Sequence, residues 1–418
     1  MVSSAIYNEN FFAKFIEVVC ILMLLKLGGK MKTQKKFKNK PRIAIIGANE
    51  SINFLILKAK EMGYETHVFA WKCDDPGEKT ADVFYPIDIA NKEEILDVCK
   101  TLGVIGIVSI TSDFAVNTVN FVARNLGLVG NSERTDVVAR NKFLMRTVFR
   151  EAGLFTPWFT KVDKYTELLF MKAHKYPVIV KPTDRWSSKG VTRVDCFEQL
   201  IDAVLYATSE SLTGEAIIED FMDGPEYSAE CICQDGVCYL LQITEKSTTG
   251  FPHYVETGHK QPADIPEDFK SYLEKIIKKA VSALSIENGA AHVEFKILDL
   301  PNSSSCEKEV GIIEIGARMG GDYIGTDLVR LSTGYDYISM VVDVSCGKKI
   351  SFAKAPHYSY SEVKFIMDEN TYNEYLIISA DDRDIERAVI FDSRFDHNIQ
   401  NSADRYGYYI LRKGDATI

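Results

Sequence analysis

The chain has 418 residues, of which 46% are hydrophobic and 26% are charged. These ordinary globular proportions exclude a mainly disordered chain, a fibrous rod and a polytopic membrane protein. Lysine and arginine total 49 against 59 aspartates and glutamates, a net charge of −10, so we expect no nucleic-acid partner. The nine scattered cysteines indicate reduced thiols rather than a disulfide framework, and we therefore expect a cytoplasmic protein.

The first forty residues differ from the rest of the chain. The apolar run 18–25 is bracketed by Glu17 and Lys26. It is therefore shorter than the roughly 20 residues of a membrane-spanning helix. A lysine-rich stretch follows, and an apolar turn beside basic residues can touch an anionic membrane surface. We favour a flexible extension over residues 1–40, or a start of translation at Met31, without stable membrane insertion.

Strand and helix patterns alternate from residue 41 to about 130. The predicted strands are 42–47, 65–70 and 104–110, and the predicted helices are 51–62, 92–102 and 115–126. This alternation predicts a doubly wound α/β domain with its ligand crevice at the carboxyl ends of the strands, near 47–50 and 111–113. Gly47 stands alone where a dinucleotide fingerprint has three glycines, which argues against an NAD-dependent oxidoreductase.

A phosphate-binding arrangement is predicted between residues 135 and 195. A helix over 135–152 carries Lys142, and a strand over 176–182 ends at Lys181 before a polar loop and a returning strand over 191–195. The loop residues whose backbone N–H groups can face phosphate oxygens are Ser187, Ser188 and Gly190. Lys181 supplies positive charge beside them, although the loop lacks the spacing of a Walker A motif.

The central segment predicts a hinge, a hairpin and a helix. A strand over 216–219 leads into a glycine- and proline-containing turn, 227–233 and 237–244 form a hairpin, and 269–284 form an amphipathic helix. Between the hairpin and the helix lies a predicted polar loop over 247–258. We expect side chains in and just after this loop to contact substrate, namely His253, Glu256 and His259.

Two carboxylates are predicted to face each other near residue 300. The strands 291–298 and 310–316 form a hairpin about a serine-rich turn centred on Ser304, which places Glu294 opposite Glu314. Cross-strand neighbours lie about 5 Å apart, so the two charges repel unless a cation binds. Hard oxygen ligands favour Mg²⁺ or Mn²⁺ over zinc. Arg318, further along the same strand direction, can hold an anion together with the metal.

These pieces together resemble the ATP-grasp superfamily of carboxylate–amine ligases, in its amino-acid ligase and carbamoyl-phosphate-synthase-like branch. The resemblance covers about residues 41–345. The matching motifs occur in the family order: N-K-x-x-x-R from Asn141, V-K-P around Lys181, S-S-K-G from Ser187, E-D-F-M-D-G-P-E from Glu219, Glu294, and E-I-G-A-R-M-G-G from Glu314. The T-E-K and E-x-G-H segments between Thr244 and His259 favour the amino-acid ligase branch.

The resemblance implies an ATP site. Glu219 and the backbone of Phe221 and Met222 would meet the adenine edge, and Glu226 would bind the ribose hydroxyls. The lysines and the polar loop would hold the phosphates. The implied ATP ligands are Lys142, Lys181, Ser187, Ser188, Gly190, Glu219, Phe221, Met222 and Glu226.

The resemblance also implies the groups that act on the transferred phosphoryl group. Glu294 and Glu314 would bind the metal, and Arg318, with Lys181, would steady the phosphoryl group and an acyl intermediate. Gly316 stands where many family members have asparagine as a further metal ligand. The implied substrate contacts are His253, Glu256, His259, Gly320 and Gly321, with the region of Asp113 as a wall of the second substrate site.

The implied fold is an α/β pre-ATP-grasp domain over 41–130, then an α+β ATP-grasp domain over 131–347 whose small lobe (about 131–218) and large lobe (about 219–347) clamp ATP, then a C-terminal α+β cap over 348–418. The implied activity is an ATP- and Mg²⁺-dependent ligase that joins a small carboxylate to an amine through an acyl phosphate, in a monomer or homodimer. Bicarbonate-activating or phosphoribosylglycinamide-forming enzymes remain alternatives within the fold. A non-catalytic ATP-binding regulator is the alternative of another class.

Overall fold

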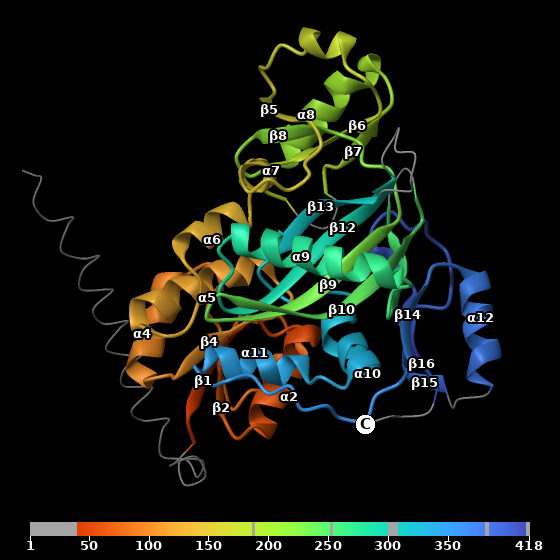
Figure 1. Cartoon of the computed structure of the whole chain (residues 1–418). Helices are drawn as coiled ribbons and strands as arrows, with labels where there is room; N and C mark the ends of the chain where they lie inside the picture. The colour runs from red at the N-terminus through yellow and green to blue at the C-terminus, as the bar shows by residue number, and fades with distance from the viewer. Residues whose placement is uncertain (1–39, 186–188, 251–253, 300–307, 381–383, 415–418) are drawn as a thin grey trace, which may run out of the picture.

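The computed structural model describes residues 40–185, 189–250, 254–299, 308–380 and 384–414. They form a parallel four-stranded sheet, an antiparallel four-stranded sheet in a projecting small lobe, and an eight-stranded antiparallel sheet (Figure 1). The extension predicted over residues 1–40 lies outside the described residues, apart from Lys40. Among the helices of these ranges, none has both the length and the apolar character needed to cross a membrane.

The parallel sheet confirms the predicted α/β class. Its strand order is β3–β2–β1–β4, with β1 Arg42–Ile46, β2 Glu65–Phe69, β3 Val83–Tyr85 and β4 Gly106–Val108. The helices are α2 Glu50–Glu61, α3 Pro76–Thr80, α4 Lys92–Leu102 and α5 Asp113–Leu126. The sequence pattern missed β3, because this edge strand is too short to give an apolar run. The strand expected over 104–110 is therefore the fourth in the chain.

Alternating side chains of β1 serve two separate cores. Ile43 and Ile45 pack with α2, whereas Ala44 and Ile46 pack with α4 and α5. Successive side chains of a strand point to opposite faces, so a strand whose every side chain is buried must be covered on both sides. Helices on both faces make the sheet doubly wound, and its strand ends are then the open edge where a ligand can approach.

The small lobe follows two short helices. The helix expected over 135–152 is wrong: α6 Glu133–Val138 and α7 Lys142–Glu151 are separate, because Asn141 caps α7 by accepting a hydrogen bond from the Leu144 N–H. The lobe's sheet has the order β5–β8–β6–β7 and is covered by α8 Leu200–Glu210. Its strands are β5 Phe159–Asp163, β6 Val178–Pro182, β7 Thr192–Val194 and β8 Glu215–Asp220, with 3-10 turns η2 Leu169–Ala173 and η3 Phe197–Gln199.

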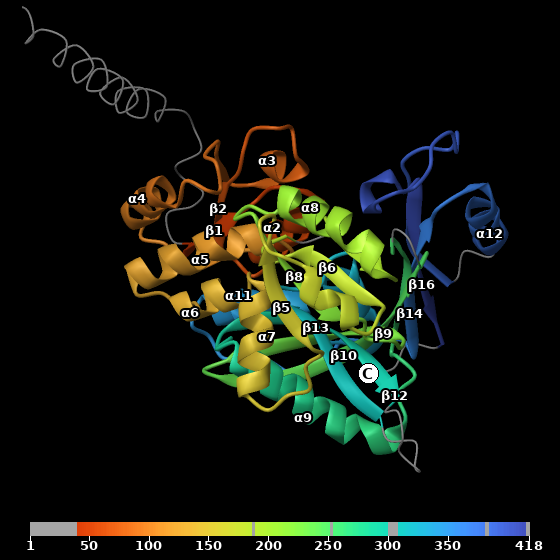
Figure 2. The same cartoon turned by 90° about the horizontal axis from the view of Figure 1, so that it is seen from above.

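The eight-stranded sheet has the order β13–β12–β9–β10–β11–β14–β16–β15 (Figures 1 and 2). Its strands are β9 Glu226–Gln234, β10 Val237–Thr248, β11 Glu256–Gln261, β12 Gly289–Asp299, β13 Lys308–Gly316, β14 Tyr360–Ile366, β15 Ile385–Ile390 and β16 Gly407–Lys413. The segment expected as a loop over 247–258 is partly strand, since β10 continues to Thr248 and β11 begins at Glu256. The strands after residue 348 join this same sheet through the β11–β14 pair.

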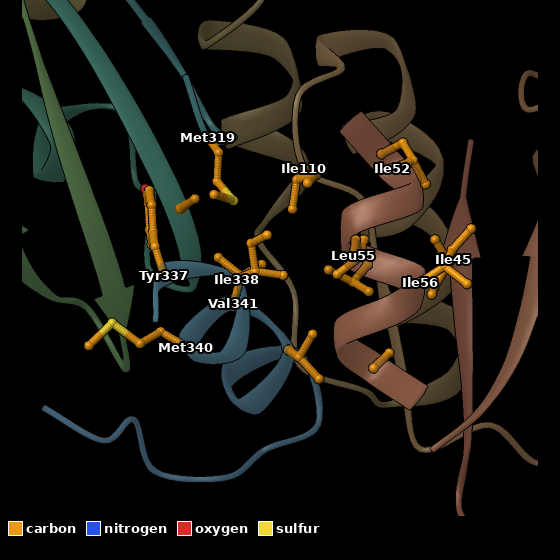
Figure 3. Close-up of a cluster of buried hydrophobic side chains, with 14 of the residues drawn as sticks. Ile45, Ile52, Leu55, Ile56, Ile110, Met319, Tyr337, Ile338, Met340 and Val341 are labelled. Carbon is orange, nitrogen blue, oxygen red and sulfur yellow. The ribbon is translucent and has the colours of Figure 1, made fainter. Parts of the chain in front are cut away.

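Helices and turns of the large sheet are α9 Glu267–Ala283, the π-helical turn η4 Ile324–Leu328, α10 Val329–Thr333, α11 Tyr337–Ser345, α12 Glu369–Ser379 and η6 Ser402–Asp404. One buried cluster joins this part to the N-terminal domain. Figure 3 shows Leu55 of α2 on the side towards Ile338 and Val341 of α11, with Ile56 on the side towards β1. The parallel sheet is therefore packed against the large lobe, and its open edge is held near the end of β13.

Candidate active site

The two predicted metal ligands lie directly opposite each other. Glu294 on β12 is the register partner of Glu314 on β13, as the hairpin pattern predicted, with a bulge immediately after Glu294. Lys246 donates to Glu294 Oε1 at 3.0 Å, and Lys142 Nζ lies 2.7 Å from Glu314 Oε2. Burial alone would raise the pKa of Glu294, but Lys246 and His292 outweigh it and hold that pKa well below its usual range. Glu294 is therefore ionised, and a side-chain cation lies against each carboxylate of the pair.

Lys142 connects the helix before the small lobe to this carboxylate pair. It is the first residue of α7, immediately after the Asn141 cap, and its own N–H donates to the Thr183 carbonyl at 2.7 Å. Its ammonium group donates to the Arg185 carbonyl as well as pairing with Glu314. Lys142 thus joins the loop after β6 to β13, where a phosphate chain spanning the lobes would have to pass.

Lys181 and Glu219 lie together in a buried ion cluster. The Lys181 ammonium pairs with Glu219, and Arg146 Nε donates to Glu219 Oε2 at 2.9 Å. Burial raises the pKa of Glu219, but the two cations outweigh it and bring the value to about 2. Burial lowers the pKa of Lys181. The Glu219 carboxylate, which is expected to meet the adenine edge, is therefore already paired with Lys181 and Arg146.

The hinge residues after Glu219 are partly engaged. The Phe221 N–H donates to the Pro177 carbonyl at 3.2 Å, and the contact of the Phe221 and Met222 backbone with adenine stays a prediction. The Met222 sulfur occupies space left by Gly311, where a Cβ atom would lie 2.5 Å from it. Gly190, at φ +74°, packs so closely on Pro182 that a Cβ would lie 2.7 Å from the ring. Ser187, Ser188 and His253 lie outside the described residues.

Lys246 is a central residue that the sequence analysis did not assign. Its buried ammonium group lies 2.8 Å from Glu226 Oε1 and 3.0 Å from Glu294 Oε1. It therefore links the acid expected to bind ribose to the acid expected to bind metal. Burial would lower the pKa of Lys246, but the surrounding carboxylates outweigh it and raise that pKa well above its usual range. Its T-E-K segment was noted only as a family likeness.

Glu230 is a second missed residue and lies in a buried network with His292. His292 Nδ1 bonds Glu230, and its Nε2 lies 3.2 Å from Glu294 Oε1. Burial would lower the pKa of His292, but the two carboxylates outweigh it and raise the value to about 9. A charged residue in the apolar run Y-S-A-E-C-I-C was a usable signal, because a buried carboxylate needs a partner. The sequence motifs give His292 no role, yet it contacts Glu294, the predicted metal ligand.

Gly320 contacts Glu230 rather than open space. Its N–H donates to Glu230 Oε2 at 2.9 Å, and a Cβ atom on Gly320 would lie 2.6 Å from Glu230 Oε1. In this structure an internal carboxylate therefore accepts the Gly320 N–H, and the contact of Gly320 with a substrate carboxylate stays a prediction. Gly321, by contrast, has space where a Cβ would project.

Arg318 pairs with the N-terminal domain. Its Nε donates to Asp113 Oδ2 at 3.0 Å, and both side chains are mostly buried. Asp113 is the first residue of α5, and Ser112 caps that helix by accepting from the Ala115 N–H. The carboxyl edge of the parallel sheet, predicted as a ligand crevice, thus meets the end of β13. A cavity of about 20 Å³ lies beside this contact and is lined by residues that include Asp113, Lys142 and Glu314.

The expected substrate residues of β11 meet the C-terminal strands. Arg405, which the sequence did not assign, binds Glu256 Oε2 at 3.1 Å and Asp322 Oδ2 at 2.9 Å. His259 Nε2 lies 3.7 Å from Asp322, and its Nδ1 is buried without a hydrogen-bond partner in the described structure. Burial raises the pKa of Asp322, but the hydrogen bond from His259 and the charge of Arg405 outweigh it and lower the value to about 2. Asp322 adopts φ +48°, an uncommon backbone conformation of the kind that gathers at functional sites.

The carboxylate pair suits a hard divalent cation that is also held by a ligand's oxygens. Among the described residues there is no group of three or more His, Cys, Asp or Glu side chains placed to hold a metal by themselves. Magnesium is commonly bound through one or two carboxylates together with substrate phosphates and water. The contacts named above go to one oxygen of Glu294 and one of Glu314, and each carboxylate has a second oxygen. These donors fit Mg²⁺ or Mn²⁺.

The structure combines an α/β domain, a small antiparallel lobe and a large antiparallel sheet. Two opposed carboxylates lie on the large sheet. This arrangement is that of an ATP-grasp fold. Residues 174–327 match the family model described as an ATP-grasp domain. The chain thus contains a segment that is similar to the ATP-grasp domain, and this segment includes both Glu294 and Glu314.

Named relatives agree with this assignment. The chain is 26% identical over 298 residues to alanine–anticapsin ligase of Bacillus subtilis, covering 64% of this chain and 60% of that protein. The L-amino acid ligase structure from Bacillus licheniformis aligns with a TM-score of 0.72 at 23% identity, covering 90% of this chain and 93% of that one. Phosphoribosylglycinamide synthetase from Anaerococcus prevotii aligns with a TM-score of 0.68 at 23% identity, covering 90% and 94%.

Proposed function

We propose that this protein is an ATP- and Mg²⁺-dependent ligase that joins a small carboxylate to an amine. The observation that carries the proposal is the register pair Glu294–Glu314 with Lys142 on one carboxylate and Lys246 on the other. Transfer of a phosphoryl group depends on positioning and on neutralising charge, more than on a protein nucleophile. The similarity to amino-acid ligases supports amino acids as the substrates.

ATP binding is proposed at the junction of the small and large lobes. Lys142 and Lys181 would bind phosphate oxygens together with the loop around Gly190, and Glu226 would bind the ribose. Lys142 can exchange its carboxylate partner Glu314 for a phosphate, because the divalent cation that arrives with ATP neutralises that carboxylate. Charge is then balanced before and after binding, which avoids leaving a buried group unpaired.

The proposed metal ligands are Glu294 and Glu314. When bound there, Mg²⁺ or Mn²⁺ would supply positive charge to the phosphate oxygens. Lys246 would keep Glu294 ionised and in place between the ribose and the metal. His292, protonated through its contact with Glu230, would hold the same Oε1 atom of Glu294 as Lys246 does.

The proposed reaction has two steps. An oxygen of the substrate carboxylate attacks the γ-phosphorus, the bond to the bridging oxygen of ADP breaks, and an acyl phosphate forms. The nitrogen of the amine then attacks the acyl carbon, the carbon–oxygen bond to the phosphate breaks, and inorganic phosphate leaves as the amine loses a proton. Arg318 would hold the transferred phosphoryl group. Substrate contacts are proposed at Glu256, His259 and Gly321.

We also propose domain boundaries after residues 40, 130 and 347. The separate parallel sheet supports the boundary at 130, whereas β14 to β16 extend the large sheet across the boundary at 347. A cytoplasmic location is proposed from the free thiols of Cys231, Cys233 and Cys238, which gather on β9 and β10. A homodimer is proposed because dimers are the commonest assembly of soluble oligomers.

The test is release of ADP and phosphate from MgATP with amino acids supplied singly and in pairs. Release that needs a particular pair, with an amide product of the matching mass, supports the proposal. Glu314→Ala should reduce turnover at least about 100-fold. Glu309→Gln on the same strand, whose carboxylate accepts from the Tyr272 hydroxyl, is the matched control and should retain turnover.

Other outcomes separate the alternatives. Release with bicarbonate alone would indicate a carboxylase or carbamoyl-phosphate-type enzyme, and release with glycine and a phosphoribosylamine a ribonucleotide-forming ligase. MgATP binding without turnover on any of these substrates would favour a regulatory protein. Absence of MgATP binding would refute the proposal.

A further inference from the structure

Arg318 is held from outside the ATP-grasp domain. Its Nε and Nη2 both bond Asp113 Oδ2, at 3.0 and 2.9 Å, and its Nη1 donates to the Met319 carbonyl at 3.1 Å. These contacts come from different directions and fix the plane of the guanidinium group. The guanidinium group is planar, so the direction of its N–H donors depends on the orientation of that plane. Asp113 therefore determines where the charge of Arg318 is directed.

Asp113 is well placed for this task. It begins α5 directly after the Ser112 cap, so its own backbone is fixed by the start of a helix. A carboxylate in the first turn of a helix is also favoured by the helix dipole. The residue thus reaches β13 from a rigid element of the N-terminal domain, across 205 positions of sequence from Arg318.

Gly316 provides the space in which this pair forms. A Cβ atom built on Gly316 would lie 3.0 Å from Asp113 Oδ1 and 3.1 Å from the Arg318 Cζ. Contacts this short would require one of the two charged groups to shift by a few tenths of an ångström. The absence of a side chain at position 316 therefore leaves room for the Asp113–Arg318 pair in the observed geometry.

We propose that Asp113 is a positioning residue for Arg318, and that Gly316 leaves the space in which the two side chains meet. This inference rests on the proposed ligase function. The N-terminal domain then supplies a working part of the phosphoryl-transfer site. The orientation of Arg318 depends on how that domain is packed.

A simpler interpretation is that the ion pair only fastens two domains together. The buried cluster between α2 and α11 already joins them (Figure 3). A second ion pair also crosses this interface, between Lys58 of α2 and Asp336 at 3.0 Å. Asp336 is the N-cap residue of α11. Asp336 is therefore a matched control: an interdomain carboxylate that contacts neither Arg318 nor the carboxylate pair.

The test compares Asp113→Asn with Asp336→Asn in the full chain. We expect Asp113→Asn to lower kcat for ADP release by roughly 10–100-fold, since misdirecting one charged donor impairs transition-state stabilisation. Affinity for MgATP should change less than about threefold, because Arg318 is assigned to the transferred group and not to the nucleotide. Asp336→Asn should leave kcat within about twofold, and Gly316→Ala should lower kcat in the same direction as Asp113→Asn but by a smaller factor.

A double-substitution cycle separates positioning from general damage. In an Arg318→Lys background, Asp113→Asn should lower kcat by less than about threefold, because the fork that Asp113 orients is already gone. Equal losses in both backgrounds would overturn the proposal, as would a wild-type kcat in Asp113→Asn.

A crystal structure of Asp113→Asn provides a readout that does not depend on substrate identity. The proposal predicts a displaced Arg318 guanidinium, and an undisturbed one would overturn it. If wild-type protein fails to turn over the substrate panel, the proposed ligase function fails first, and the crystal structure still decides the positioning role.

Discussion

Glu219→Gln should strongly destabilise the small lobe. The substitution keeps the shape of the side chain but removes the charge that neutralises Arg146 and Lys181, both buried with it. Breaking a buried ion pair from one side costs about 3–5 kcal/mol. The pKa provides a second measure: a fall from 4.5 to about 2 corresponds to roughly 3 kcal/mol of free energy. The two measures agree, so we expect a loss of about 3 kcal/mol.

The same pKa gives a pH dependence with a definite sign. Because the folded-state pKa of Glu219 is depressed, its stabilisation is present above the ordinary pKa near 4.5 and is lost as the pH falls towards 2. Urea denaturation at neutral and acid pH, followed by tryptophan fluorescence, measures both effects. Trp158 reports on this lobe, since its carbonyl accepts from the Asp220 N–H beside Glu219.

Glu215→Gln is the control on the same strand. Glu215 pairs with Lys161, and both side chains are at least a third exposed, so this pair should be worth less than about 1 kcal/mol. If Glu219→Gln and Glu215→Gln lose the same free energy, or if the acid limb is unchanged in Glu219→Gln, the reasoning about the buried cluster is refuted.

Three further predictions follow from the site. His292→Asn should abolish a stability contribution that is present below pH 6.5 and lost as the pH rises towards 9, measured as Tm against pH. Glu314→Gln should raise the Mg²⁺ concentration needed for half-maximal turnover by at least about tenfold, measured by magnesium titration. Arg405→Met should raise KM for an amino-acid substrate more than KM for ATP, because it leaves Glu256 and Asp322 without their shared cation.

A control variant is available for Arg405→Met, and each of the three predictions can be contradicted by a specific result. The control is Arg412→Met on β16. Arg412 pairs with Glu386 and not with Glu256 or Asp322, so its loss should leave both KM values unchanged. An equal rise in both KM values for Arg405→Met would contradict the assignment of its role. A pH profile of Tm that survives in His292→Asn, or an unaltered magnesium requirement in Glu314→Gln, would contradict the other two.

Features set by local pattern were predictable from the sequence. The pairing of Glu294 with Glu314 follows from the period of a strand and a short connection, and the α/β class follows from alternating apolar runs. The helix over 135–152 was wrong because apolar periodicity continues through the Asn141 cap, and the cap, not the pattern, divides it. The edge strand β3 was missed because three residues carry no period.

Features set by long-range packing were not predictable. Nothing near Arg318 in the sequence indicates that Asp113 will meet it, and nothing near Glu256 indicates Arg405. Lys246 looked like an ordinary strand lysine, and only the sheet order places it between two acids. Chemistry at this site thus depends on contacts between separate parts of the chain, which the order of motifs alone does not define.

The most direct measurement follows one oxygen atom. With MgATP, the substrate carboxylate labelled with ¹⁸O and the amine, attack on the γ-phosphorus transfers one carboxylate oxygen to inorganic phosphate. Formation of the carboxylate–amine product with one ¹⁸O in each phosphate released is the predicted result. Unlabelled phosphate alongside that product would contradict activation of the carboxylate as an acyl phosphate.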